Sequence, residues 1–191
     1  MTERTERSEQ KLNTETAGKA PEVILLNGPS SAGKSSISRA LQKLLAEAGR
    51  EAAIISLDDY MGLVLEPGEE IWEDDVFEVV PPMCRDIEEA KLQGRTVIID
   101  HVITSERIYT ATAAAGGQCM KTVLVSCSRE LLREREAARG DRFIGSAETS
   151  LEYLYPKDGY DLCIDSGKTS PEEAAQTIAG RFFTADNIIV S

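Results

Sequence analysis

The chain has 191 residues, of which 41% are hydrophobic and 28% are charged. This length and composition fit one globular domain and exclude a fibrous, collagen-like or wholly disordered protein. The formal net charge of -12 would repel a phosphate backbone, so we expect no nucleic-acid partner. No stretch approaches the roughly 20 apolar residues that a membrane helix needs, so we also expect no membrane span.

The N-terminal segment and the cysteines both suggest a location inside the cell. The first 20 residues are polar, carry mixed charge and contain no apolar run, which excludes a secretory signal. We therefore predict a disordered tail over 1–20, one domain over 21–191, and a cytoplasmic protein. The 4 cysteines show no CxxC spacing and His101 is the single histidine, so no zinc pattern is present. The cysteines are predicted to be buried, unpaired thiols.

Short apolar runs alternate with helical patterns along the whole chain. Strands are predicted over residues 23–27, 52–57, 96–99, 121–126 and 161–164. Helices are predicted over 35–48, from beyond Pro81 and Pro82 to Gly94, between the third and fourth strands, from Ser128 to about Gly140, and after Ser170. This alternation predicts βαβ units with a parallel sheet and helices on both faces. Ligands of such a fold bind at the carboxyl ends of the strands.

The strongest functional signal lies between the first strand and the first helix. Residues 28–35 read GPSSAGKS and match the phosphate-binding pattern G-x-x-x-x-G-K-[ST]. Backbone N–H groups of such a loop surround phosphates, Lys34 reaches the β- and γ-phosphates, and Ser35 offers a hydroxyl to magnesium. The residues predicted to bind ATP are Gly28, Ser30, Ser31, Ala32, Gly33, Lys34, Ser35 and Ser36.

Carboxylates follow two further strands. Asp100 ends the third strand, where P-loop proteins place a carboxylate that holds Mg²⁺, although a helix cap or turn is the alternative. Asp58 ends the second strand, where a carboxylate can take the proton of an attacking hydroxyl, and by position alone Asp59 competes with it. His101 is predicted to be a satisfied structural residue.

Arginines recur along the helix that begins near Ser128. Guanidinium groups of Arg133, Arg135, Arg139 and Arg142 could stabilise the transferred phosphoryl group, with Arg139 and Arg142 also predicted to bind the nucleotide. The alternative is an exposed helix with Glu–Arg pairs, which interleaved glutamates support. Residues 66–75 hold the single tryptophan, Trp72, among acids, and are either an acceptor loop or a solvated loop.

Taken together these residues resemble the chloramphenicol phosphotransferase family of small P-loop kinases. The likeness spans residues 23–173 and rests on NGPSSAGKS, the aspartate after the second strand, VIIDHV, REREAARGDR and GYDLCID. It implies a nucleoside- or shikimate-kinase-like fold in three layers, with five parallel strands and an arginine-rich lid. It also favours Asp58 as the catalytic base. His101 stands where the family has a second aspartate, and the segment after Asp58 is shorter and more acidic.

The predicted function is therefore transfer of the γ-phosphate of ATP, with Mg²⁺, to a hydroxyl of a small molecule. Lys34, Asp58, Arg135 and Arg139 are the predicted catalytic residues, and Ser35 and Asp100 the predicted metal ligands. The resemblance makes a chloramphenicol-like antibiotic the first acceptor to test, with resistance as its consequence. A kinase of another metabolite or nucleotide sugar, and a nucleotide-dependent switch protein, stay open as alternatives, as does a homo-oligomer.

Overall fold

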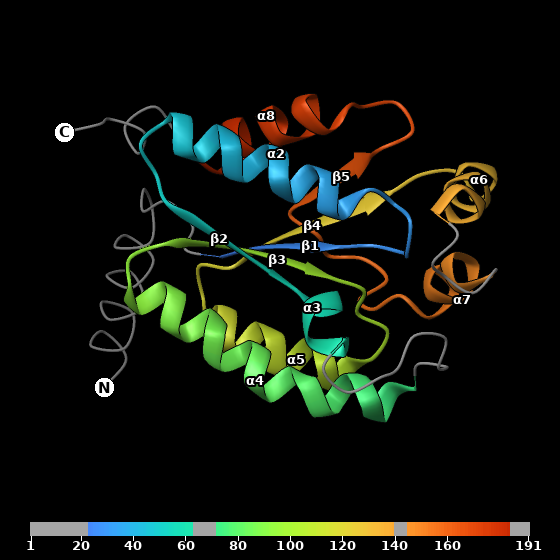
Figure 1. Cartoon of the computed structure of the whole chain (residues 1–191), viewed down its shortest axis with the longest axis horizontal. Coiled ribbons are helices and arrows are strands. Elements are labelled where there is room, and N and C mark those ends of the chain that lie inside the picture. Colours follow the sequence, from blue (N-terminus) through green and yellow to red (C-terminus); the bar gives the residue numbers. More distant parts are fainter. Residues whose placement is uncertain (1–22, 63–71, 140–144, 184–191) are drawn as a thin grey trace, which may run out of the picture.

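Strands and helices alternate along the chain as predicted (Figure 1). The computed structural model describes residues 23–62, 72–139 and 145–183. Its elements in chain order are β1 (Val23–Asn27), α2 (Lys34–Glu47), β2 (Ala52–Ser56), α3 (Leu57–Met61), α4 (Glu73–Leu92), β3 (Thr96–His101), α5 (Glu106–Gly116), β4 (Lys121–Ser126), α6 (Arg129–Arg139), α7 (Ser146–Tyr153), β5 (Leu162–Asp165) and α8 (Pro171–Phe182). The predicted tail over 1–20 lies outside the described residues.

The strands form one parallel sheet in the order β2-β3-β1-β4-β5. β1 is central, and each of its residues is buried because helices cover both faces. Its register places Leu26 beside Asp100 and Asn27 beside His101, so the polar ends of β1 and β3 lie together. The five-stranded parallel sheet and the α/β class of the prediction are confirmed.

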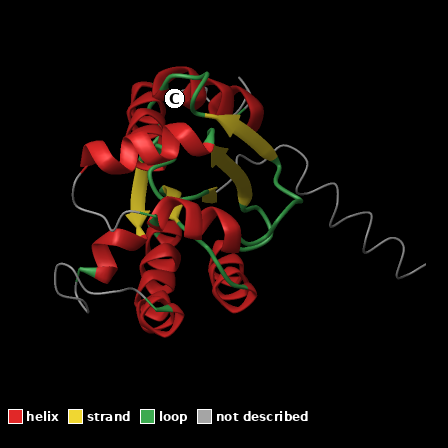
Figure 2. Cartoon of the chain, turned by 90° about the vertical axis from the view of Figure 1, so that its right-hand side faces the viewer, coloured by secondary structure: helices red, strands yellow, loops and turns green. Residues whose placement is uncertain are grey.

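Two apolar cores lie on opposite faces of the sheet, because successive side chains of a strand point to opposite sides. Ile24 and Leu26 pack with α2 and α8, whereas Val23 and Leu25 pack with α4 and α5. Figures 1 and 2 show these two helix layers with the sheet between them, and α6 and α7 beyond the carboxyl ends of the strands. The carboxyl ends of the strands are therefore the part of the sheet that is open to a ligand.

Helix α4 begins earlier than predicted. It starts at Glu73 and runs through Pro81 and Pro82, whose missing N–H groups normally end a helix. Three acids in its first turn favour the helix N-terminus, and the Asp75 carboxylate accepts the N–H of Trp72 at 2.8 Å. Its buried apolar face outweighs the cost of the prolines. The acidic stretch is thus partly helix, and its remainder lies outside the described residues.

Other differences are local. β3 extends through His101, Leu57 begins α3 rather than ending β2, and α7 was missed. Ser170 caps α8 as predicted, with its hydroxyl accepting the N–H of Glu173 at 3.2 Å. The four cysteines are unpaired, but the expectation of burial is wrong: three are half-buried and Cys163 is exposed.

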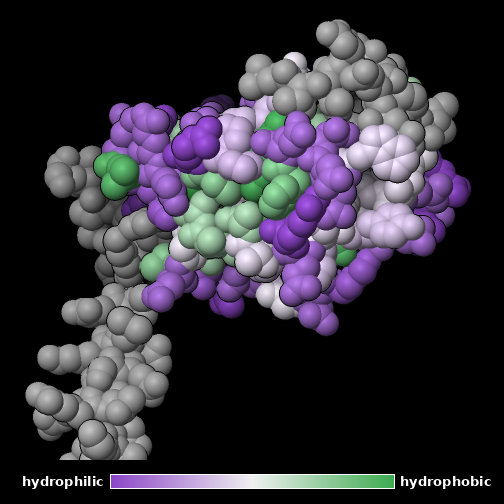
Figure 3. Space-filling model, turned by 90° about the horizontal axis from the view of Figure 1, so that it is seen from below, coloured by the Kyte–Doolittle hydropathy of each residue, from purple (hydrophilic) through white to green (hydrophobic). Residues whose placement is uncertain are grey.

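Seen from below, the layer of α4 and α5 is mostly hydrophilic around a smaller apolar area (Figure 3). Phe77 contributes to this surface with 37% exposure, and the Arg107 guanidinium lies 4.1 Å from the centre of its ring. No helix within the described ranges is long and apolar enough to cross a membrane.

Candidate active site

The phosphate-binding loop is tied to the sheet by Asn27, the last residue of β1. The Asn27 side chain is fully buried and makes four hydrogen bonds. Its Oδ1 accepts the N–H groups of Gly28 at 2.9 Å and Ile103 at 3.0 Å. Its Nδ2 donates to the carbonyl of Tyr155 and to the hydroxyl of Tyr160, both at 2.8 Å. One side chain thus joins the start of the loop to two distant segments.

Two glycines of the loop are required by its geometry. A Cβ at Gly28 would lie 2.0 Å from the carbonyl oxygen of Val125 in β4, so only glycine allows this close approach. Gly33 has φ 94°, in the left-handed region, just before α2 begins. These constraints turn the loop around the N-terminus of α2, where the helix dipole attracts an anion. The predicted strand-loop-helix unit is therefore present.

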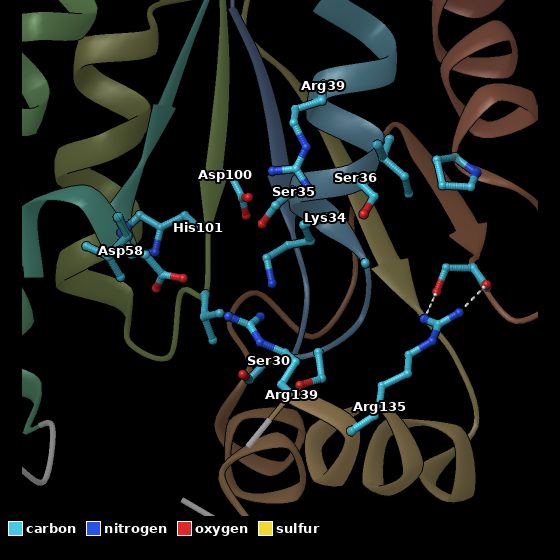
Figure 4. Close-up of a pocket in the computed structure, with 18 of the residues that line it drawn as sticks. Ser30, Lys34, Ser35, Ser36, Arg39, Asp58, Asp100, His101, Arg135 and Arg139 are labelled. Atoms are coloured by element: carbon cyan, nitrogen blue, oxygen red, sulfur yellow. Dashed lines mark hydrogen bonds between the residues drawn. The ribbon is translucent and has the colours of Figure 1, made fainter. Parts of the chain in front are cut away.

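Lys34 lies within this loop and is 6% exposed. Its ammonium donates to the carbonyls of Gly28 at 3.0 Å and Pro29 at 2.9 Å, which compensate its burial. The ammonium borders a cavity of about 640 Å³ at the carboxyl ends of the strands (Figure 4). A cavity of this size accommodates a nucleotide-sized ligand.

The cavity brings together most of the predicted site residues. Those that line it are Ser30, Ser31, Gly33, Lys34, Ser35, Ser36, Asp58, Asp100, Arg135 and Arg139. Two predicted residues do not line it: Gly28 packs against β4, and Ala32 is fully buried in the core. Arg142 lies outside the described residues. The remaining predicted residues come from separate strand ends that the parallel sheet aligns.

Asp100 and Ser35 meet at the wall of the cavity nearest β1. Asp100 is 5% exposed at the end of β3, and Figure 4 shows its carboxylate and the Ser35 hydroxyl pointing into the same part of the cavity. Oxygen ligands of these two kinds are those that Mg²⁺ prefers beside nucleotide phosphates. The residues present therefore fit a magnesium site.

Asp58 and Asp59 are separated by the turn of α3. Both lie in its first turn and both are exposed, but only Asp58 lines the cavity. Figure 4 shows Asp58 on the side of the cavity opposite the phosphate-binding loop. Position along the chain left the two aspartates as alternatives, and the helical turn brings only Asp58 to the cavity.

The arginines of α6 have three different surroundings. Arg133 is exposed and pairs with Glu148 of α7 at 2.7 Å. Arg135 donates to the Ser166 hydroxyl at 3.0 Å, the Ser166 carbonyl at 2.9 Å and the Ala32 carbonyl at 3.3 Å. Arg139 is exposed and lines the cavity. Arg135 therefore holds the phosphate-binding loop against the segment after β5, and Arg139 is the arginine placed to reach a ligand.

Glutamate and serine side chains attach α7 to the rest of the site. Glu136 is 2% exposed, and its carboxylate accepts the N–H groups of Gly145 at 2.7 Å and Ala147 at 2.8 Å, which caps α7. The Ser150 hydroxyl of α7 accepts the N–H of Ser30 at 2.9 Å. The alternative of an exposed helix with Glu–Arg pairs therefore does not hold for Glu136, which is buried.

His101 is the site residue that departs most from its prediction. It is 1% exposed and lines the cavity, yet neither ring nitrogen has a hydrogen-bond partner within the described part of the chain. Burial lowers the pKa of its imidazole to about 4 and outweighs the nearby Val102 backbone, which raises it; the Lys34 ammonium lowers this pKa further, and the Asp58 carboxylate opposes that effect. The expected satisfied histidine is thus an unsatisfied, neutral one.

Sequence reasoning missed several residues of the cavity. Arg39 lines it from α2, and its spacing of four from Ser35 was a usable signal because such residues share a helix face. Ser166 and Thr169 line it from the segment between β5 and α8. No local pattern marks these two, since only the packing of β5 beside β4 brings them to the site.

The comparisons with known proteins identify the family and the fold of the chain. The model of the chloramphenicol phosphotransferase-like protein family matches residues 21–182. The chain belongs to this family. The predicted resemblance to this family is therefore confirmed. No curated protein matches the sequence.

Solved structures share the architecture at low sequence identity. APS kinase CysC of Mycobacterium tuberculosis, in complex with AMPPNP and APS, has 18% identity and a TM-score of 0.68, covering 87% of this chain and 99% of that one. A sugar kinase of Janibacter sp. HTCC2649 has 16% identity and a TM-score of 0.66 over 88% and 98%. A gluconokinase of Sinorhizobium meliloti 1021 has 21% identity and 0.63 over 89% and 97%. This phosphotransferase-like chain therefore has the fold of P-loop kinases.

Proposed function

We propose that this protein is an ATP- and Mg²⁺-dependent kinase that phosphorylates a hydroxyl group of a small molecule. The observation that carries the proposal is that one cavity has the phosphate-binding loop with Lys34 on one side and the Asp58 carboxylate on the other. This arrangement supplies both halves of a phosphoryl transfer, a site for the donor and a base for the acceptor. Membership of the family supports the same conclusion.

The nucleotide would lie with its phosphates over the N-terminus of α2. Backbone N–H groups of the loop and the Lys34 ammonium bind the β- and γ-phosphates, and Arg139 reaches the transferred group from α6. Ser35 and Asp100 would hold Mg²⁺, which neutralises phosphate charge when bound. Arg135 keeps the loop in place through its bonds to Ala32 and Ser166.

The acceptor hydroxyl would lie beside Asp58. Its proton passes to the Asp58 carboxylate while its oxygen forms a bond to the γ-phosphorus. The bond from that phosphorus to the β–γ bridging oxygen breaks, and ADP leaves with the electron pair of that bond. The exposure of Asp58 at the mouth of the cavity suits an acceptor that enters from solvent.

The family makes a chloramphenicol-like antibiotic the first acceptor to test. The test measures phosphate transfer from γ-labelled ATP with Mg²⁺ to chloramphenicol and to a panel of hydroxylated antibiotics, sugars and nucleotide sugars, with product mass as the readout. A product that is about 80 Da heavier than the acceptor, as one added phosphoryl group requires, supports the proposal. Transfer to another panel member would replace the acceptor and keep the reaction.

Matched variants test the roles within the site. Lys34→Ala should abolish transfer, and Asp58→Asn should lower kcat by at least about 100-fold while ATP binding is retained. Asp59→Asn is the control, because Asp59 shares the exposed turn of α3 but does not line the cavity. Equal losses in the two asparagine variants would remove Asp58 as the base. Binding of ATP without transfer to any acceptor would instead favour the nucleotide-dependent switch.

A further inference from the structure

The imidazole of His101 is an unsatisfied polar group in an otherwise well-paired part of the site. Its neighbour across the sheet, Asn27, is equally buried and makes four hydrogen bonds. Both ring nitrogens of His101 lack a partner within the described residues. Buried polar groups are nearly always hydrogen-bonded, because leaving one unpaired costs free energy of folding. An orphaned side chain on a cavity wall therefore points to a ligand that pairs with it.

The position of His101 indicates which part of a ligand it would meet. Figure 4 shows His101 on the same side of the cavity as Asp58, with the phosphate-binding loop across from both. His101 lies close enough to both Lys34 and Asp58 to interact with them electrostatically, so it lies near the point where the transferred phosphate would meet the acceptor. A group bound to His101 would therefore belong to the acceptor and not to the nucleotide. It would also lie within a few bonds of the hydroxyl that faces Asp58.

The chemistry of the imidazole limits the kind of group. A neutral imidazole offers one N–H donor and one nitrogen acceptor, and a hydroxyl can pair with either. An anionic group at His101 would lie beside the Asp58 carboxylate, which repels it, while the nearby Lys34 ammonium would already be paired with the phosphates of the bound nucleotide. The surroundings of His101 therefore favour an uncharged hydroxyl over a carboxylate or phosphate.

We propose that His101 is a specificity-determining residue that hydrogen-bonds a second hydroxyl of the acceptor, and that the acceptor is an uncharged diol or polyol. The second hydroxyl lies on a carbon adjacent to the phosphorylated one or one carbon further. This inference rests on the proposed kinase function and adds the substrate class to it. His101 holds this hydroxyl while Asp58 takes the proton of the reacting one.

The test compares paired acceptors in the full-length enzyme. These are chloramphenicol and its 1-deoxy analogue, and neutral hexoses with their monodeoxy analogues, each assayed for kcat/KM with ATP and Mg²⁺. In the wild type, removal of the second hydroxyl should lower kcat/KM by about 10- to 100-fold, as loss of a partner for a buried polar group implies. In His101→Leu, kcat/KM for the diol should fall by a similar factor, whereas kcat/KM for the deoxy analogue should change by less than about threefold.

Further variants separate this role from a structural one. His101→Phe repeats the apolar change in case the leucine variant does not fold, and His101→Gln should recover much of the preference because an amide keeps a donor and an acceptor. The KM for ATP should stay within about twofold in all of them. Without ligand, the apolar variants should melt at the same temperature as the wild type or higher, because they remove an unpaired buried group.

Thr112→Val is the matched control. Thr112 is also fully buried, but its hydroxyl is satisfied by donation to the Ile108 carbonyl at 2.9 Å. Thr112→Val should leave the ratio of diol to deoxy activity unchanged.

The inference is overturned if the ratio of diol to deoxy activity is the same in His101→Leu as in the wild type. It is also overturned if the wild type prefers anionic acceptors, or if both apolar variants melt well below it. Wild-type protein that transfers phosphate to no alcohol would overturn the proposed function itself, and the inference with it. Transfer without coupling to His101 overturns the inference alone, so the two failures are distinguishable.

Discussion

The hydrogen bonds of Asn27 make this residue a sharp test of how the phosphate-binding loop is held. We predict that Asn27→Leu, which keeps the side-chain volume, lowers the free energy of unfolding by about 2 to 5 kcal/mol. The change leaves the buried N–H groups of Gly28 and Ile103 without acceptors, each at a cost of about 1 to 3 kcal/mol. The partly exposed partners Tyr155 and Tyr160 can turn to water and add less.

Denaturant unfolding followed by circular dichroism measures this loss, and calorimetry should show a melting temperature lower by roughly 5 to 15 °C. ATP affinity, measured by isothermal titration, should fall as well because the loop loses its anchor on β1. Gln42→Leu is the control: it removes one partly buried bond, from Nε2 to the Ala52 carbonyl at 2.9 Å, and should cost no more than about 1 kcal/mol. A loss below about 1 kcal/mol in Asn27→Leu would refute the reasoning.

Three further changes test other parts of the structure. Gly28→Ala should lower the free energy of unfolding by at least about 2 kcal/mol, because its Cβ would clash with the Val125 carbonyl. Gly180→Ala is the control: it lies in open space on α8 and should raise the free energy of unfolding by about 0.5 to 1 kcal/mol. Similar values for the two variants in chemical denaturation would contradict the close approach of Gly28 to β4. Arg135→Lys should raise the KM for ATP by about tenfold in a coupled ADP-release assay because it breaks the forked contact with Ser166, and an unchanged KM would show that this contact does not matter for the loop. Partial burial raises the pKa of Asp161, but hydrogen bonds from the Thr122 N–H and hydroxyl, together with Lys121, outweigh it and lower that pKa below its usual value. At pH values above the ordinary aspartate pKa of about 4, the wild type should therefore be more stable than Asp161→Asn by about 1 kcal/mol. Thermal melts should show this advantage disappear as the pH falls through the lowered pKa. An advantage independent of pH would show that it does not come from the charge of Asp161.

The site illustrates which features local sequence can predict. The loop from Gly28 to Ser35 is contiguous and matches one short pattern, so a local pattern was enough to identify it. The strands were predicted with small errors at their ends because apolar runs bounded by turns are local signals. Asp58 and Asp100 followed from the rule that ligands meet the carboxyl ends of parallel strands.

Features that depend on partners far along the chain were not predictable in this way. An exposed pattern of charges was the alternative for this helix, but the folded chain brings α7 to Glu136 and uses its carboxylate as a cap. Pro81 and Pro82 were expected before a helix, yet the apolar face of α4 outweighs their local preference by packing on the sheet. The Asn27 network joins residues 128 and 133 positions away, which no window of sequence contains.

By itself the sequence therefore determined the class of fold, the phosphate-binding loop and the strand ends that carry carboxylates, because backbone sterics, periodicity and a contiguous anion-binding pattern are local properties. The tertiary structure alone decided that Asp58 and not Asp59 lines the cavity, that Arg135 holds the loop while Arg139 lines the cavity, and that His101 is buried without a hydrogen-bond partner among the described residues. These outcomes depend on how separate elements pack, since burial and hydrogen-bond satisfaction are properties of a side chain's surroundings in space and not of its neighbours in sequence.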